Sequence, residues 1–266
     1  MVSPVLISAS RRTDIPAFFP DWFSECLSRG TATYRNPYSG RPASVSLAPD
    51  DVAAFVFWTR NPLPFLRVLA RLERARYRSV FHVTVTGYPR AIEPAAPPLA
   101  EALAALRHLS ETVGPARVLW RFDPILPGEE PSEIVARFET VSAAIEGLSG
   151  RCTLSIAHAY RKSLRATRTT PELWRPSGGL HTAVERIAAI GRARGFRVVS
   201  CCSPALRHWG VPGAACVDME LLASLYPAMP VFAAPSPVRD GCLCAASRDI
   251  GTYRTCRHGC LYCYAA

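Results

Sequence analysis

Short apolar runs alternate with longer amphipathic stretches along most of the 266-residue chain. The apolar runs are rich in β-branched and aromatic residues, which favours strands. They are Val5–Ser8, Ala54–Trp58, Ser79–Thr86, Arg117–Arg121, Cys152–Ala157 and Phe196–Ser200. The stretches between them have the length and apolar spacing of helices, and they are Ala17–Arg29, Pro64–Ala75, Leu99–Val113, Ser132–Leu148 and His181–Arg194. Strands that alternate with such helices form βαβ units around a parallel sheet.

Six successive strands of this kind predict an α/β fold, and in particular a partial (β/α)6-type, TIM-like barrel. A doubly wound open sheet is the alternative. Gly114-Pro115 and Gly195 are expected to end two helices, and Ser132 is expected to cap another. We expect the barrel to occupy residues 1–228. Residues 229–266 then form a Cys-rich C-terminal segment, which begins with a Pro/Ala-rich loop up to Pro237.

Polar clusters directly follow nearly every predicted strand. In a parallel barrel the carboxyl ends of the strands meet at one rim, where such enzymes place their active sites. Arginines at this rim suit a carboxylate or a phosphate, and Tyr160 or Lys162 would suit proton or hydrogen-atom transfer. An ion pair between Arg121 and Asp123 that closes the barrel is the structural alternative for that pair. The expected rim residues are Arg12, Asp14, Arg60, Arg121, Asp123, His158, Tyr160 and Lys162.

The net charge of +10 changes this picture little. Lys162 is the single lysine among 31 basic residues, and the arginines are scattered rather than clustered. The charge alone therefore permits a nucleic-acid partner without favouring one. No apolar run approaches the roughly 20 residues of a membrane span, and the N-terminus lacks the pattern of a signal peptide. We expect a cytoplasmic protein without a membrane partner, in which ten reduced cysteines point first to metal binding.

The C-terminal cysteines Cys256, Cys260 and Cys263 have the spacing C-x3-C-x2-C. Three thiolates on one loop suit three irons of a [4Fe–4S] cluster, which leaves the fourth iron open to a small molecule. Zinc is the competing interpretation, but it would need a fourth ligand from His258 or elsewhere. We expect His258 to pack or to act beside the ligands instead.

A second set of cysteines precedes this loop. Cys201 (or its neighbour Cys202), Cys216, Cys242 and Cys244 would supply four thiolates. Four thiolates suit a second, fully ligated [4Fe–4S] cluster or a structural zinc. Cys26 and Cys152 lie among apolar residues and are expected in the core.

The spacing Cys256-x3-Cys260-x2-Cys263, with Tyr262 before the last cysteine, resembles the signature of radical S-adenosylmethionine (SAM) enzymes. The resemblance implies a partial barrel with these three cysteines as cluster ligands. It also implies that the open iron binds SAM, that Tyr262 lies near the adenine, and that reductive cleavage gives a 5′-deoxyadenosyl radical. Arg60 and His158 are further candidates for binding the cofactor. The substrate would be an unidentified small molecule or peptide, and the electron donor a protein such as flavodoxin or ferredoxin.

In most of that superfamily the motif follows the first strand, whereas here it stands at the C-terminal end. A circularly permuted barrel would reconcile the two, with Ser247–Thr255 leading into the cysteines. This hypothesis requires that the two ends of the chain do not lie on opposite faces of the fold.

Nearly the whole chain also resembles a bacterial family called domain of unknown function 1848, which implies a shared fold and site but no reaction. The resembling stretches are Ser8–Asp14, Phe57–Pro62, Thr84–Tyr88, Trp120–Pro124 and Asp249–Tyr253 with the cysteine tail. The sequence thus predicts a radical-SAM-like iron–sulfur enzyme. The alternatives are a nucleic-acid-modifying or repair enzyme with the same cofactor, and a non-catalytic zinc or iron–sulfur protein.

Overall fold

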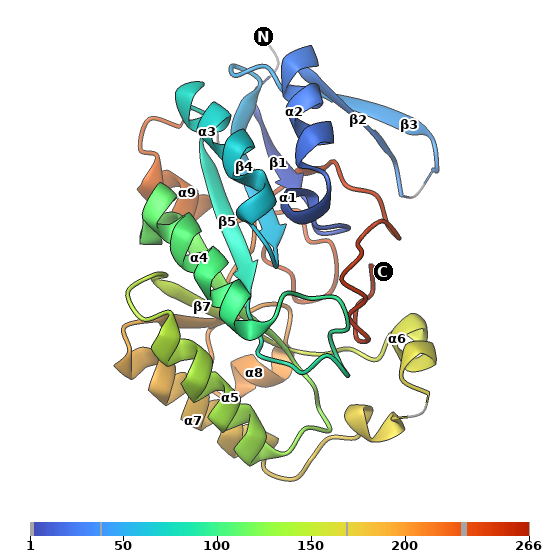
Figure 1. The fold of residues 1–266 in the computed structure, drawn as a ribbon, viewed down its shortest axis with the longest axis vertical. Helices are drawn as coiled ribbons and strands as arrows, with labels where there is room; N and C mark the ends of the chain where they lie inside the picture. The colour runs from blue at the N-terminus through green and yellow to red at the C-terminus, as the bar shows by residue number, and fades with distance from the viewer. Residues whose placement is uncertain (1–2, 38, 169, 230–232, 266) are drawn as a thin grey trace.

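The main sheet contains seven strands, all paired in parallel, in the order β8-β7-β6-β5-β4-β1-β9. It belongs to a computed structural model that describes residues 3–37, 39–168, 170–229 and 233–265 (Figure 1). The predicted α/β class with a parallel sheet is therefore confirmed. The strands are β1 (Val5–Ala9), β4 (Val52–Thr59), β5 (Ser79–Thr84), β6 (Val118–Ile125), β7 (Arg151–Ile156), β8 (Arg197–Ser200) and β9 (Arg248–Asp249).

Each predicted helix forms, with changes at its ends. The first is divided at Pro20, whose ring removes a backbone donor, and Pro64–Ala75 begins as a 3-10 turn, η1 (Leu63–Phe65). The prediction that Ser132 caps a helix is wrong, because Pro131 already occupies the first turn and Glu130 stands at the cap without a side-chain bond. Gly114 follows its helix as predicted. The helices are α1 (Ile15–Phe18), α2 (Pro20–Arg29), α3 (Leu66–Arg74), α4 (Leu99–Val113), α5 (Pro131–Ala144) and α7 (Leu180–Ala193).

Several short elements have no counterpart in the predictions, because their sequences are too short or too polar to show a period. An antiparallel hairpin of β2 (Thr31–Arg35) and β3 (Pro42–Ser46) follows α2. The others are α6 (Arg161–Ala166), α8 (Pro204–His208), α9 (Met219–Leu225), η2 (Pro115–Arg117), η3 (Pro171–Trp174) and β9. The predicted loop over residues 229–237 lies partly outside the described residues, and its described part, 233–237, carries only an isolated bridge at Pro235.

From β1 to β8 the strand order follows the chain without the reversal of a doubly wound sheet. The crossover helices α3, α4, α5 and α7 accordingly lie on one face of the sheet (Figure 1). In the part of the chain that the structure describes, β8 and β9 are the two edges, and no closed barrel forms. No described helix is both long and apolar enough to span a membrane.

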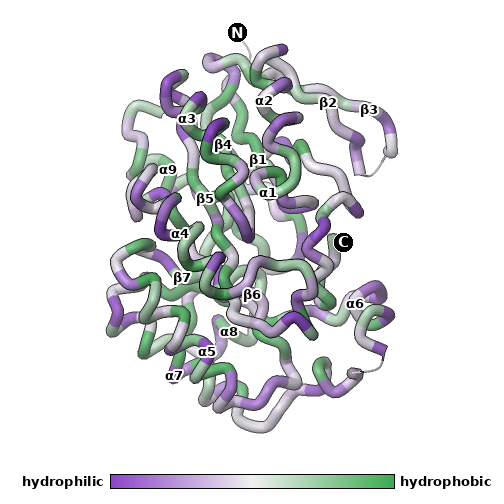
Figure 2. Tube along the Cα trace, in the orientation of Figure 1, coloured by the Kyte–Doolittle hydropathy of each residue, from purple (hydrophilic) through white to green (hydrophobic). Residues whose placement is uncertain are grey.

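Alternation along the strands decides which side chains face which layer. Ile7, Phe57, Phe81 and Trp120 pack with the helices, in a large core that also contains Cys26 and Cys152 as predicted. Their neighbours Leu6, Val56 and Val80 pack on the opposite side against residues from 201–229 and 233–245, and we call this side the inner face. Figure 2 shows the central strands as mainly hydrophobic. Toward the carboxyl ends the inner face becomes polar, with His82, Thr84, Arg121, Asp123 and Ser155.

The C-terminal segment joins the sheet beside the first strand. In β9, Arg248 and Asp249 pair in parallel with Ile7 and Ser8 of β1. The residues predicted to lead into the cysteines therefore run alongside β1. The cysteine loop continues past the carboxyl end of that strand, where Tyr264 donates to the Arg11 carbonyl at 2.8 Å. In Figure 1 the C-terminus lies between α1 and α6.

Candidate functional site

A cavity of about 620 Å³ opens where the carboxyl ends of the strands meet the C-terminal segment. Its size is in the range of small-molecule sites. Of the predicted site residues, Lys162 alone does not line it, because it lies exposed on α6. The others that line it are Arg12, Asp14, Arg60, Arg121, Asp123, His158, Tyr160 and Tyr262, together with both sets of cysteines.

The three C-terminal thiols lie on the cavity wall contributed by one loop. Cys260 is buried, whereas Cys256 and Cys263 are half-buried. Burial raises the pKa of Cys260 to about 12, and the Cys263 and Cys256 thiols act in the same direction, while Arg60 opposes the shift. Binding to a metal would release the protons of these thiols.

The Asp14 carboxylate connects the C-terminal cysteine loop to α1 and to the end of β4 through hydrogen bonds. It accepts hydrogen bonds from the backbone N–H of Ala17 at 2.9 Å and of Arg60 at 2.8 Å. The same carboxylate lies 2.8 Å from Nε2 of His258, whose ring also packs on Phe18 at a centroid distance of 4.6 Å. His258 therefore packs beside the cysteines as predicted, and the contacts of Asp14 position the loop.

Arg60, Glu93 and Tyr262 form a buried group behind the cysteine loop. The Arg60 guanidinium donates to both Glu93 carboxylate oxygens at 2.7 Å. The Tyr262 hydroxyl makes short contacts with the same two residues. Burial opposes the charge on Arg60, but Tyr262, Cys260 and Glu93 outweigh it and hold its pKa well above the ordinary value. Glu93 lies in a loop without a periodic pattern, so nothing in the sequence marked it.

Asp249 is the second anchor that the sequence analysis missed. Its buried carboxylate accepts from Ser8 Oγ at 2.6 Å, Ser10 Oγ at 2.7 Å, the Arg11 backbone at 2.9 Å and the Gly251 backbone at 3.0 Å. The Nε atoms of Arg11 and Arg12 lie 3.6 and 3.7 Å from it. Asp249 stands inside one of the stretches that carry the family resemblance, and that was the available signal.

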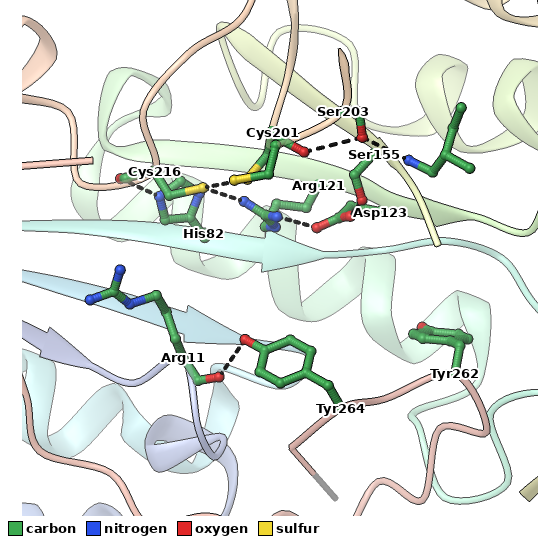
Figure 3. Close-up of polar contacts among 12 residues, drawn as sticks. Arg11, His82, Arg121, Asp123, Ser155, Cys201, Ser203, Cys216, Tyr262 and Tyr264 are labelled. Atoms are coloured by element: carbon green, nitrogen blue, oxygen red, sulfur yellow. Dashed lines mark hydrogen bonds and ion pairs between the residues drawn. The ribbon is translucent and has the colours of Figure 1, made fainter. Parts of the chain in front are cut away.

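Arg121 and Asp123 form an ion pair on the inner face, which was the structural alternative for these two residues, although it closes no barrel in the described part of the chain (Figure 3). Ser155 of the next strand donates to the other Asp123 oxygen. Across the cavity, Arg239 donates to the Tyr160 hydroxyl at 3.1 Å. His158 is exposed and its Nε2 lies 3.5 Å from the Cys202 carbonyl. The rim thus combines the Arg121–Asp123 ion pair with His158, which is exposed, and Tyr160, which is half-buried.

The second set of cysteines also comes together, and it includes both Cys201 and Cys202. The Cys201 sulfur lies 3.3 Å from that of Cys216 and 3.9 Å from that of Cys202. Cys242 and Cys244 are buried on the same side of the cavity. Within the described ranges, no group of three or more His, Cys, Asp or Glu side chains has the placement to hold a metal ion.

Fold and site define an α/β protein with a parallel sheet and a thiol-rich cavity at its carboxyl edge. A family model described as "Domain of unknown function (DUF1848)" matches residues 6–265. The chain belongs to this family, as the sequence resemblance predicted. No curated protein and no solved structure matches the chain.

Proposed function

We propose that the protein is a radical-SAM-type iron–sulfur enzyme. The observation that carries the proposal is the placement of Cys256, Cys260 and Cys263 on one loop that follows a parallel strand and faces a single large cavity. Thiolates are the usual protein ligands of iron–sulfur clusters. Three thiolates are the donor chemistry of a [4Fe–4S] cluster with one open iron, and the loop would have to draw them together on binding, because no group of three or more described His, Cys, Asp or Glu side chains is already placed to hold a metal ion. When bound, the cluster would supply the electron for reductive cleavage of SAM.

The strand order supports the permuted partial barrel on which this proposal depends. Because β9 pairs in parallel with β1, the order from β9 through β1 to β8 resembles a barrel whose first strand and cysteine loop have moved to the C-terminus. In this interpretation β9 takes the place of the strand that precedes the motif. The helices α1 and α2 then stand where the helix after the motif is expected.

The chain's own polar groups have distinct roles in this proposal. Asp14, through His258, holds the cysteine loop against α1. Arg11 presents a buried Nη1 that has no hydrogen-bond partner among the described residues, which suits the carboxylate of SAM or of the substrate. Tyr262 and Arg60 would form the adenine side of the cavity. His158 and Tyr160 also line the cavity and suit substrate contact or proton transfer.

The test is anaerobic reconstitution with iron and sulfide, followed by reduction with SAM present. We expect 5′-deoxyadenosine and methionine, measured by liquid chromatography and mass spectrometry. Cys260→Ala is expected to abolish both products while circular dichroism shows a folded chain. Cys26→Ala is the matched control, because Cys26 is a buried thiol of the helix-side core, and it should keep full product formation.

Two outcomes would refute the proposal. One is a reconstituted, reducible cluster, seen by electron paramagnetic resonance, that gives no 5′-deoxyadenosine. The other is a purified protein that holds zinc and takes up no iron, which would favour the non-catalytic alternative. Retention of the SAM-responsive cluster in Cys260→Ala would show that the ligands are other residues.

A further inference from the structure

We infer that Cys201, Cys202, Cys216, Cys242 and Cys244 form a second iron–sulfur site, separate from the C-terminal cysteine loop. We call these residues the five-thiol group. They come from three segments: the end of β8, the turn before α9, and the loop before β9. All five side chains are at most 9% exposed. The inference concerns metal binding and does not depend on cleavage of SAM.

Strand β8 positions the first of these thiols, that of Cys201. In β8, Val198 packs with the helix-side core, so the alternation points Val199 and Cys201 to the inner face. Cys202 would then point away from it if the backbone stayed extended. Instead, Cys202 has a φ of 48°, in the left-handed region that side chains other than glycine seldom adopt. This turn brings both adjacent thiols to the same cavity wall, and such a local cost is typical of functional positions.

Hydrogen-bond donors surround the sulfur atoms of the group. Cys244 Sγ accepts from the backbone N–H of Cys216 at 3.3 Å and of Val217 at 3.4 Å. Cys216 Sγ accepts from Arg121 Nη1 at 3.1 Å, and Figure 3 shows Arg121 between this sulfur and Asp123. Arg239 Nη2 lies 4.0 Å from Cys201 Sγ. Donors and positive charge at sulfur stabilise thiolates, and hydrogen bonds to sulfur are a main determinant of iron–sulfur cluster potentials.

The spacings favour an iron–sulfur cluster over zinc. Structural zinc sites take their cysteines from C-x2-C to C-x4-C loops that converge on one ion. Here two cysteines are adjacent and two are separated by a single residue, so neither pair makes such a loop. A [4Fe–4S] cluster gives each of four thiolates its own iron. We assign Cys201, Cys216, Cys242 and Cys244 as these ligands, and Cys202 as the fifth thiol beside them. Their side chains would have to rearrange on binding, because the Cys201 and Cys216 sulfurs are in direct contact at 3.3 Å and no described group is already placed to hold a metal ion.

This assignment gives Arg121 a different role from the catalytic one expected at the rim. Its guanidinium is held between Asp123 and Cys216, so it neutralises charge at the second site. Both cysteine groups line the same cavity. A second cluster at the five-thiol group would therefore face the space that opens beside the C-terminal loop.

The experiment separates the two sites by mutation and counts iron and sulfide after anaerobic reconstitution. We expect about eight irons per chain in the unmodified protein and about four in the triple variant Cys256→Ala, Cys260→Ala, Cys263→Ala. Adding Cys216→Ser and Cys244→Ser to the triple variant should reduce the count to about zero. Cys26→Ala should keep about eight, and circular dichroism checks that every variant is folded.

Electron paramagnetic resonance gives a readout that is independent of the count. The reduced triple variant should show one cluster signal that SAM does not change, because all four irons have thiolate ligands. About four irons in the unmodified protein with none in the triple variant would overturn the second site and leave the proposed function intact. Zinc instead of iron in the triple variant would also overturn it. Four irons in both proteins would support the second site and contradict the first.

Discussion

Replacing Asp249 with Asn tests whether β9 and the cysteine loop depend on one buried carboxylate. The side chain keeps its shape, but one acceptor oxygen becomes an NH2 group. Asp249 accepts four hydrogen bonds, two on each oxygen, and lies within 3.7 Å of two arginine Nε atoms. The substitution therefore removes two acceptor contacts and leaves two half-buried arginines without a counter-charge.

The size of the effect follows from these contacts. A hydrogen bond to a charged group contributes about 1.5–3 kcal/mol, and removal of one partner from a buried ion pair costs about 3–5 kcal/mol. These terms overlap because they describe the same carboxylate. We expect Asp249→Asn to lower the free energy of unfolding by about 3–5 kcal/mol. Asp240→Asn is the matched control on the same segment, because Asp240 is exposed and should change the free energy by less than about 0.5 kcal/mol.

Two measurements check this expectation. Urea denaturation followed by circular dichroism gives the free energy of unfolding for both variants. Hydrogen exchange with mass spectrometry should show that peptides from residues 247–265 exchange faster in Asp249→Asn than in Asp240→Asn. If the two variants unfold at the same urea concentration and exchange alike, the carboxylate does not anchor the loop and our reasoning about β9 is wrong.

Two further substitutions test the same region. A Cβ on Gly251 would lie 2.0 Å from Ser10 Oγ and 2.5 Å from Ser10 Cβ, so Gly251→Ala should lower the free energy of unfolding by about 1–3 kcal/mol. A Cβ on Gly150 meets open space, so Gly150→Ala should leave this free energy unchanged. Equal urea midpoints for the two variants would contradict the predicted clash. Glu93→Ala leaves the Arg60 guanidinium buried without its carboxylate and should cost about 3–5 kcal/mol. The exposed Glu111→Ala should cost little, and equal losses in the two variants would show that the Arg60 pair does not stabilise the fold.

The sequence by itself determined the elements and the sheet type. Apolar runs such as residues 79–84 and 118–122 identified strands, because alternation and β-branched residues are local properties of the chain. The same alternation explains why Arg121 and Asp123 share one face while Trp120 and Phe122 enter the core. The spacing of Cys256, Cys260 and Cys263 likewise identified the candidate ligands, because three thiols on one loop can be recognised without knowing the tertiary structure.

The tertiary structure decided what anchors these residues. Asp249 bonds Ser8 across 241 positions in the chain, and β9 is only two residues long. Such a strand has no period to detect, and no local property of Asp249 identifies its partners. Glu93 was missed for the same reason, because its importance comes from Arg60 and Tyr262, which lie far from it in sequence.

For the cysteines too, the sequence determined one part of the site and the tertiary structure another. Their number and spacing along the chain indicated two groups, but the sequence left open whether Cys201 or Cys202 belonged to the second. Both thiols line the cavity in the structure, where the backbone turns at Cys202 and the two side chains pack among the residues of the inner face. Local patterns fix which residues form strands and which thiols share a loop, whereas the approach of distant segments fixes which charges and sulfurs meet.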